Sequence, residues 1–181
     1  VADVVVGVDG DETVVVRSAP PMSGPRNHGS MPLADRSARE GVRTVLGPAS
    51  LFETVLDRWK LLTAAALVGI ADAAKDLGVA YVKEREQFGV PIGSFQAVQH
   101  GLADLPVAID GGRLLTHKAA WALDNVVDGL LDWANNDITD GPALATMALL
   151  FAADAAVMAT DRSLHYHGGY GFAEEYDIQM Y

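Results

Sequence analysis

Histidine and carboxylate side chains are the first candidates for chemistry in this chain, because a Glu three residues before a His on a helix is a di-iron ligand pattern. None of the four histidines His100, His117, His165 and His167 follows this pattern. The residues three positions before these four histidines are Ala97, Leu114, Arg162 and Leu164. His165 and His167 would also lie on different sides of a helix, with no third ligand nearby. The spacing therefore does not predict a metal site.

Other classes of reaction lack the residues that they need. The 181-residue chain contains no Cys, which excludes disulfides, thiolate chemistry and Cys-ligated zinc. No Ser sits in a nucleophile elbow, and no Gly-rich loop leads into Lys and Ser or Thr. Asp9, Asp11 and Glu12 do not follow the spacing of a calcium loop and indicate a solvated turn. The net charge of -11 argues against nucleic acid as a partner.

Composition also bears on location. The lack of Cys fits a reducing compartment, and we expect a cytoplasmic protein. The stretch from Leu61 to Ala74 is strongly hydrophobic but is interrupted by Gly69 and Asp72 and is too short for a bilayer, so we expect no membrane span. Because the chain begins with Val1 and not Met, we expect the natural protein to begin well before it.

The first 48 residues have the pattern of β structure. In residues 3–17, two runs of β-branched residues flank Asp9 and Gly10, which predicts a hairpin. Residues 18–41 are rich in Pro, Gly and Ser and predict a loop, and Val42 to Leu46 predicts one more strand. Two or three strands are too few for an independent sheet, so the β part in residues 1–48 is incomplete or completes itself against something outside this sequence.

The rest of the chain has helical spacing. A first long helix is predicted from Ser50 to about Phe88, with a broad apolar face that includes Trp59, Leu62 and Tyr81.

Two further long helices follow. The second is predicted from Ser94 to about Trp133, with a kink at Pro106, and the third from Pro142 to about Tyr166. Long helices with short links predict a mainly α, antiparallel bundle over residues 49–181.

Two segments carry a more specific signal, namely YVKEREQFGVPIGSFQAVQHGLAD from Tyr81 to Asp104 and HYHGGYGFAEEYD from His165 to Asp177. In order and separation they resemble the signature regions of acyl-CoA dehydrogenases, and the resemblance covers roughly residues 50–181. The family combines an N-terminal helical domain, a middle β domain and a C-terminal four-helix bundle. The resemblance thus implies the latter part of the β domain in residues 1–48 and a bundle domain, truncated at its end, in residues 49–181.

The chemistry implied by the resemblance is α,β-dehydrogenation of an acyl-CoA thioester with hydride transfer to FAD. In this family FAD lies at a dimer interface, and Arg85 would reach the pyrophosphate of a cofactor bound mainly by the neighbouring subunit. At Gly168, Gly169 and Gly171 the missing Cβ atoms would let backbone amides approach the ligand. The other cofactor-binding residues implied in the same way are Gln87, Phe88, Phe95, Gln96 and His165.

No catalytic residue is assigned. The family's base is a Glu, and the position on the first helix that some members use for it matches Trp59, which cannot abstract a proton. The nearest carboxylates are Glu53 and Asp57, and Asp57 lies on another face of the helix. The base position that most members use falls after Tyr181.

The resemblance also implies a substrate site and partners. Asp57 to Lys60 matches a region that contacts CoA, so Arg58 and Lys60 are candidate substrate-binding residues, with surface charges as the alternative. Expected partners are an acyl-CoA, electron-transfer flavoprotein as the acceptor, and further subunits in a homodimer, a homotetramer or a heterotetramer. The chain is then either part of a catalytic subunit or a non-catalytic partner subunit, as in hetero-oligomeric members associated with steroid side-chain breakdown. The remaining alternative is an unrelated helical bundle that binds proteins.

Overall fold

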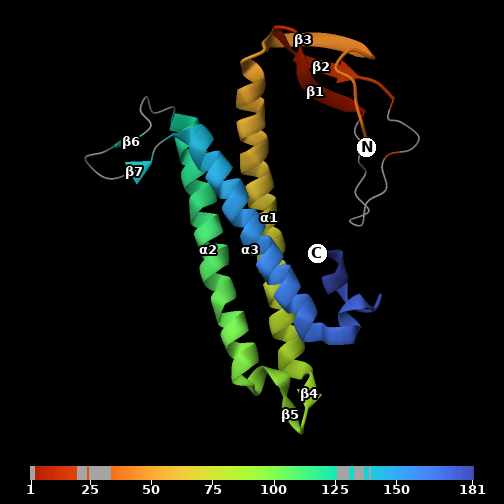
Figure 1. Ribbon diagram of the computed structural model, residues 1–181, viewed down its shortest axis with the longest axis vertical. Helices are drawn as coiled ribbons and strands as arrows, with labels where there is room; N and C mark the ends of the chain where they lie inside the picture. Colours follow the sequence, from red (N-terminus) through yellow and green to blue (C-terminus); the bar gives the residue numbers. More distant parts are fainter. Residues whose placement is uncertain (1–2, 20–23, 25–33, 126–130, 133–136, 139) are drawn as a thin grey trace. The chain divides into compact units, whose positions relative to one another are not determined.

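The computed structural model describes residues 3–19, 24, 34–125, 131–132, 137–138 and 140–181 (Figure 1). The chain divides into two compact units, Val1–Leu56 and Asp57–Tyr181. The domain boundary predicted between residues 48 and 49 coincides with the end of the last strand, whereas the two compact units meet between Leu56 and Asp57. The predicted boundary stays a prediction. Most of the predicted loop over residues 18–41 lies outside the described residues.

The first unit contains an antiparallel sheet in the order β1-β2-β3. Its strands are β1 (Val4–Asp9), β2 (Glu12–Arg17) and β3 (Val42–Pro48). The β1–β2 hairpin turns at Gly10, whose φ of 60° suits a residue without a Cβ. The predicted hairpin and third strand are confirmed, and β3 is two residues longer than predicted.

The second unit is helical. It is built from α2 (Gln96–Asn125), α3 (Gly141–His167) and most of α1 (Leu51–Glu84). The mainly α fold class with a small preceding sheet is confirmed, and α3 agrees with its prediction to within one residue at each end. The predicted second helix extends too far, because Leu131–Asp132 (β6) pairs with Asp137–Ile138 (β7). Trp133 itself lies outside the described residues.

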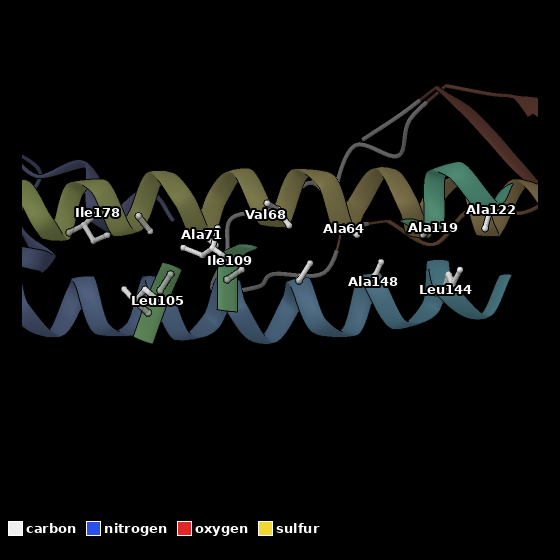
Figure 2. Packing of buried hydrophobic residues seen from close by; sticks show 14 residues of the cluster. Ala64, Val68, Ala71, Leu105, Ile109, Ala119, Ala122, Leu144, Ala148 and Ile178 are labelled. Atoms are coloured by element: carbon white, nitrogen blue, oxygen red, sulfur yellow. The ribbon is translucent and has the colours of Figure 1, made fainter. Parts of the chain in front are cut away.

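The helices meet through small side chains. Figure 2 shows Ala64, Val68 and Ala71 of α1 in one cluster with residues of α2 and α3. The apolar face predicted for α1 is wrong at Trp59 and Leu62, which are 55% and 70% exposed. Two other residues of that face, Ile70 and Leu77, do pack against the cluster. Helix α1 is apolar on nearly every side, so periodicity could not select the buried face. Small residues do so because they allow the closest approach of two helices.

Helix α3 is also notable for its hydrophobicity. By length and composition alone, Gly141–Phe172 could cross a membrane, with a hydropathy of 1.8 over an 18-residue window that is 39% buried. A core helix passes the same test, and α3 contributes Ala148, Ala152, Ala156 and Ala159 to the core cluster.

Helix α1 ends four residues before the predicted Phe88. Glu86–Gln87 (β4) and Val90–Pro91 (β5) form a short hairpin instead. Its two central residues, Phe88 and Gly89, have φ values of 55° and 80°, as a two-residue hairpin turn requires.

Two short connections complete the second unit. The 3₁₀ turn η1 (Ile92–Ser94) precedes α2, so Ser94 lies in this turn and α2 starts two residues later than predicted. After α3, the chain continues through η2 (Gly168–Phe172) and η3 (Asp177–Met180). Ile178 of η3 is buried in the core cluster, which anchors this C-terminal segment to the helices.

Candidate functional site

An open pocket of about 430 Å³ lies where the C-terminal ends of α1 and α3 meet. The described residues that line it include Arg85 and no Asp or Glu. A pocket with a cation and no carboxylate favours an anionic ligand, although the chain as a whole is acidic. The lining consists of Tyr81, Arg85, Gln87, Ile92, Tyr166, His167, Gly168, Gly169 and Tyr170.

The backbone of Arg85 is fixed between helix and hairpin. Its N–H donates to the carbonyl oxygen of Tyr81 at 2.9 Å, which continues the helical pattern by one residue. Its own carbonyl oxygen accepts from the N–H of Ile92 at 2.8 Å, which closes the β4–β5 hairpin. Arg85 is therefore held at the base of the hairpin by both of its backbone polar groups.

The side chain of Arg85 is half-buried and has no charged partner. Among the described carboxylates, none lies within salt-bridge distance of its guanidinium. Its central carbon instead lies over the ring of Tyr170, 5.2 Å from the ring centroid. The charge of Arg85 thus remains available to a ligand.

Four aromatic rings join the ends of α1 and α3 to the C-terminal segment. Tyr81 stacks on His167 with a centroid separation of 4.0 Å, and Tyr176 lies edge-on to both, at 5.7 and 5.6 Å. Tyr170 is 5.8 Å from Tyr176. Nδ1 of the buried His167 lies 2.7 Å from the carbonyl oxygen of Ser163, so Nδ1 carries the proton that is donated to it. Burial raises the pKa of Tyr81, which keeps its hydroxyl protonated.

The glycines of the second motif play different parts. Gly168 ends α3 with a φ of 59°, and its N–H donates to the carbonyl oxygen of His165. At Gly169, a Cβ would have no atom within 4 Å, so this side of the backbone is open. Gly171 is buried and does not line the pocket, and its Cβ would lie 2.7 Å from Cδ1 of Leu164. Gly171 is thus needed for packing and not for access.

The remaining residues of the first motif lie on the hairpin and at the start of α2. Gln87 lines the pocket, and its side-chain amide donates to the carbonyl oxygen of Glu86. Phe88 is 94% exposed at the hairpin turn, and its ring contacts that of Phe95 edge to face at 6.3 Å. Gln96 is exposed as the first residue of α2. Phe88, Phe95 and Gln96 form a surface beside the pocket and do not line it.

His165 faces a second pocket. This pocket, of about 570 Å³, shares Ile92 and Tyr166 with the first and is otherwise lined by Ala97, Val98, Asp161, Arg162 and His165. Tyr166 therefore separates the histidine from Arg85. The structure brings Arg85, Gln87, Gly168 and Gly169 into one pocket and places His165 in the next.

The candidate substrate residues lie near the other end of α1 and are already paired. Arg58 donates to Oδ1 of Asp124 at 2.8 Å and to the carbonyl oxygen of Leu123 at 3.2 Å, which connects α1 to α2. Lys60 donates to Oδ1 of the buried Asp57 at 2.9 Å. The structure does not bring Arg58 and Lys60 to the pocket of Arg85.

Several pocket residues were not assigned from the sequence, namely Tyr81, Tyr166, His167 and Tyr170. One signal was available, because Tyr81 precedes Arg85 by four residues and so shares its face of a helix. No sequence spacing relates Arg85 to Tyr170. In the part of the chain that the structure describes, no group of three His, Asp or Glu side chains could hold a metal.

Comparison with known proteins identifies relatives of this chain. Residues 49–181 match the family model described as acyl-CoA dehydrogenase, C-terminal domain. The chain is 41% identical over 128 residues to the probable acyl-CoA dehydrogenase YngJ of Bacillus subtilis, covering 71% of this chain and 30% of that protein. It is 32% identical over 186 residues to the acyl-CoA dehydrogenase IpdE2 of Mycolicibacterium smegmatis, covering 100% of this chain and 51% of the relative. The chain thus spans about half of one of these curated relatives and less than a third of the other.

Solved structures extend the likeness to the first unit. A variant of the Tcur3481-Tcur3483 steroid ACAD superposes with a TM-score of 0.70 at 32% identity. The superposition covers 98% of this chain and 47% of the solved one. The similarity therefore includes the sheet as well as the helices.

Proposed function

Because this chain belongs to the acyl-CoA dehydrogenase family, we propose that it forms part of an FAD-dependent subunit that catalyses α,β-dehydrogenation of an acyl-CoA thioester. The observation that supports this proposal most directly is Arg85, an unpaired cation in a pocket without carboxylates. Arg85 donates to the pyrophosphate of FAD in a charge-assisted hydrogen bond. That FAD is bound mainly by a neighbouring subunit.

The residues present fit such a cofactor. The open side of the Gly169 backbone gives a flat approach for a large ligand, and the lining carries no negative charge. Phe88 and Phe95 offer exposed aromatic surfaces beside the pocket, which suit a planar nucleotide group. When bound, FAD supplies the electron acceptor for the hydride that leaves the β carbon of the substrate.

The roles of the other residues follow from where they lie. Gln87 and the backbone of Gly168 and Gly169 hold the nucleotide part of FAD, next to Arg85. His165 and Gln96 contribute hydrogen bonds from the neighbouring pocket and from the start of α2. Phe88, at a φ of 55°, is kept in an unfavourable conformation that presents its ring outward.

A specific observation favours a second candidate function, that of a non-catalytic partner subunit. Trp59 occupies the helical position that some members use for the base, and the nearby Asp57 is buried and paired with Lys60. A buried, paired carboxylate is poorly placed to accept a proton. In this alternative the chain completes the FAD site of a catalytic subunit, within an assembly of two kinds of chain such as the name Tcur3481-Tcur3483 denotes.

The proposal includes partners and a location. The substrate is an acyl-CoA, electron-transfer flavoprotein accepts the electrons, and the protein works as an oligomer in the cytoplasm. These assignments rest on membership of the family and on the absence of Cys.

Flavin binding by the full-length protein in its native assembly tests the main proposal. We expect flavin absorbance in the purified protein, and Arg85→Ala should weaken FAD binding by about 10- to 100-fold, the value of a hydrogen bond to a charged group. Arg58→Ala is the matched control, since it removes the same charge from the other end of α1 and should leave FAD affinity unchanged. A wild-type assembly that never carries flavin would contradict the proposal.

A second experiment distinguishes a catalytic subunit from a partner. The chain is purified at full length without other subunits, loaded with FAD, and mixed anaerobically with a series of acyl-CoA thioesters. Bleaching of the flavin indicates that the chain has its own base. Bleaching only after a second kind of subunit is added indicates the partner role, and the mass and flavin content of the complex then give the stoichiometry.

A further inference from the structure

Arg85 has a long side chain without a charged partner among the described residues, so its direction must come from another contact. We propose that Tyr170 is a positioning residue, which holds the guanidinium of Arg85 toward the pocket through a cation–π contact. The inference rests on the proposed function, in which Arg85 binds the FAD pyrophosphate. Tyr170 belongs to the segment from His165 to Asp177 and Arg85 to the segment from Tyr81 to Asp104, and no sequence spacing relates the two residues.

The contact between the two residues has the required geometry. The central guanidinium carbon of Arg85 lies over the ring of Tyr170 at 5.2 Å from its centroid, within the range of about 6 Å for a cation–π contact. Backbone hydrogen bonds hold the start of the Arg85 side chain at the base of the hairpin. They leave its χ torsions free, and the Tyr170 ring restricts these torsions.

An aromatic ring suits this purpose better than a carboxylate does. An Asp or Glu would occupy the N–H groups of Arg85 and neutralise its charge, so that an anionic ligand would have to displace it. A ring attracts the cation by its face and accepts none of its in-plane hydrogen bonds. Tyr170 therefore attracts the guanidinium without neutralising its charge, which leaves N–H donors of Arg85 for phosphate oxygens.

Tyr170 is itself held in place by the C-terminal segment. Its ring lies 5.8 Å from Tyr176, which contacts both Tyr81 and His167. The segment is closed by a hydrogen bond from the N–H of Ala173 to the carbonyl oxygen of Tyr170 and is anchored by the buried Ile178. The position of Tyr170 is therefore set by contacts to α1 and α3 that do not involve Arg85.

The test is a double-mutant cycle on FAD binding in the full-length protein and its native assembly. Tyr170→Leu should weaken FAD binding about threefold to tenfold, which corresponds to a cation–π contact at a partly exposed site. Tyr170→Phe keeps the ring and should bind FAD as the wild type does. In an Arg85→Ala background, Tyr170→Leu should cause no further loss.

The outcomes separate the inference from its alternatives. Equal FAD affinity of the wild type and Tyr170→Leu would overturn it. An equal loss in Tyr170→Phe would assign the effect to the hydroxyl, and a loss that persists without Arg85 would assign it to general packing. Either result also overturns the inference.

A measurement without flavin separates failure of this inference from failure of the proposed function. Phenylglyoxal modifies arginine side chains, and mass spectrometry of the peptides gives the rate at Arg85. This rate reports how accessible the guanidinium is to the reagent. We expect Tyr170→Leu to raise this rate and Tyr170→Phe to leave it unchanged, with Arg58 as the internal reference. Equal rates in wild type and Tyr170→Leu overturn the contact, whether or not the protein binds FAD.

Discussion

The two ends of α1 each carry an arginine, and the two arginines are held in opposite ways. Arg58 donates to Asp124 and to the carbonyl oxygen of Leu123. Its guanidinium is therefore paired and connects α1 to α2. The guanidinium of Arg85 lies over the ring of Tyr170, has no salt bridge to a described carboxylate, and lines an open pocket. The comparison teaches that a carboxylate partner turns one arginine into a link between helices, whereas an arginine without one keeps its charge available to a ligand.

The largest predicted effect is a loss of stability caused by a substitution near the end of α1 that lines the pocket. A Cβ at Gly78 would lie 2.5 Å from Oγ and 3.3 Å from Cα of Ser163, so Gly78→Val must force α1 away from α3. We expect a loss of about 3 kcal/mol in the free energy of unfolding, by overpacking. Urea denaturation measures this loss.

Another glycine on α1 supplies the control. A Cβ at Gly69 would meet no atom within 4 Å, so Gly69→Ala should stabilise the protein by about 0.5–1 kcal/mol through helix propensity. If Gly78→Val and Gly69→Ala destabilised the protein equally, the close approach of Ser163 would not be the reason why position 78 needs a glycine.

Ser163 gives a prediction of the opposite sign. Its hydroxyl is fully buried and has no hydrogen-bond partner among the described residues. Ser163→Ala removes an unsatisfied polar group without adding volume and should stabilise the protein by about 1 kcal/mol. Thermal unfolding measures the change. A loss of stability would show that the hydroxyl has a partner, such as a water molecule.

Arg58 sharpens the comparison at the other end of α1. Arg58→Ala should cost about 0.5–1 kcal/mol of stability, because the ion pair with Asp124 is partly exposed. Asp124→Ala should cost a similar amount, and the double variant little more than either. The sequence prediction that Arg58 binds CoA makes a different claim, namely that Arg58→Ala lowers acyl-CoA affinity while Asp124→Ala does not. Calorimetric titration with an acyl-CoA decides between them.

The smallest effect concerns Asp72, which lies midway along α1. Its carboxylate accepts from Lys75 and Arg113. The hydrogen bond from Lys75 lowers the pKa of Asp72 below its ordinary value of 3.8. A lowered folded-state pKa stabilises the protein above pH 3.8, and this contribution is lost as the pH falls through the folded-state value.

Asp72→Asn should therefore cost about 0.5 kcal/mol at neutral pH, a value reduced by the exposure of the pair to solvent. The difference from wild type should shrink as the pH falls below 3.8. Urea denaturation over a pH series measures it, with the exposed Asp154 of α3 as the site of a control substitution to Asn. A difference that does not change with pH would exclude the charge of Asp72 as its cause.

Much of the fold could be predicted from local patterns. The hairpin around Gly10, the third strand and α3 agree with the sequence analysis to within two residues, because turn chemistry and helix boundaries depend on neighbouring residues. The end of α1 was predicted less well. Continuous helical periodicity up to Phe88 concealed the hairpin, whose turn places a bulky residue at positive φ.

The sequence by itself determined the family, through two motifs at the right separation, and with it the residues that could contact FAD. Only the tertiary structure decided which of them come together. It buried the small-residue face of α1 and exposed Trp59, placed Gly168 and Gly169 beside Arg85, and placed His165 in the next pocket. It also paired Arg58 with Asp124 and gave Arg85 the ring of Tyr170. The reason is physical, since these contacts join residues far apart in the chain, and the partner that each charge meets follows from packing and not from local spacing.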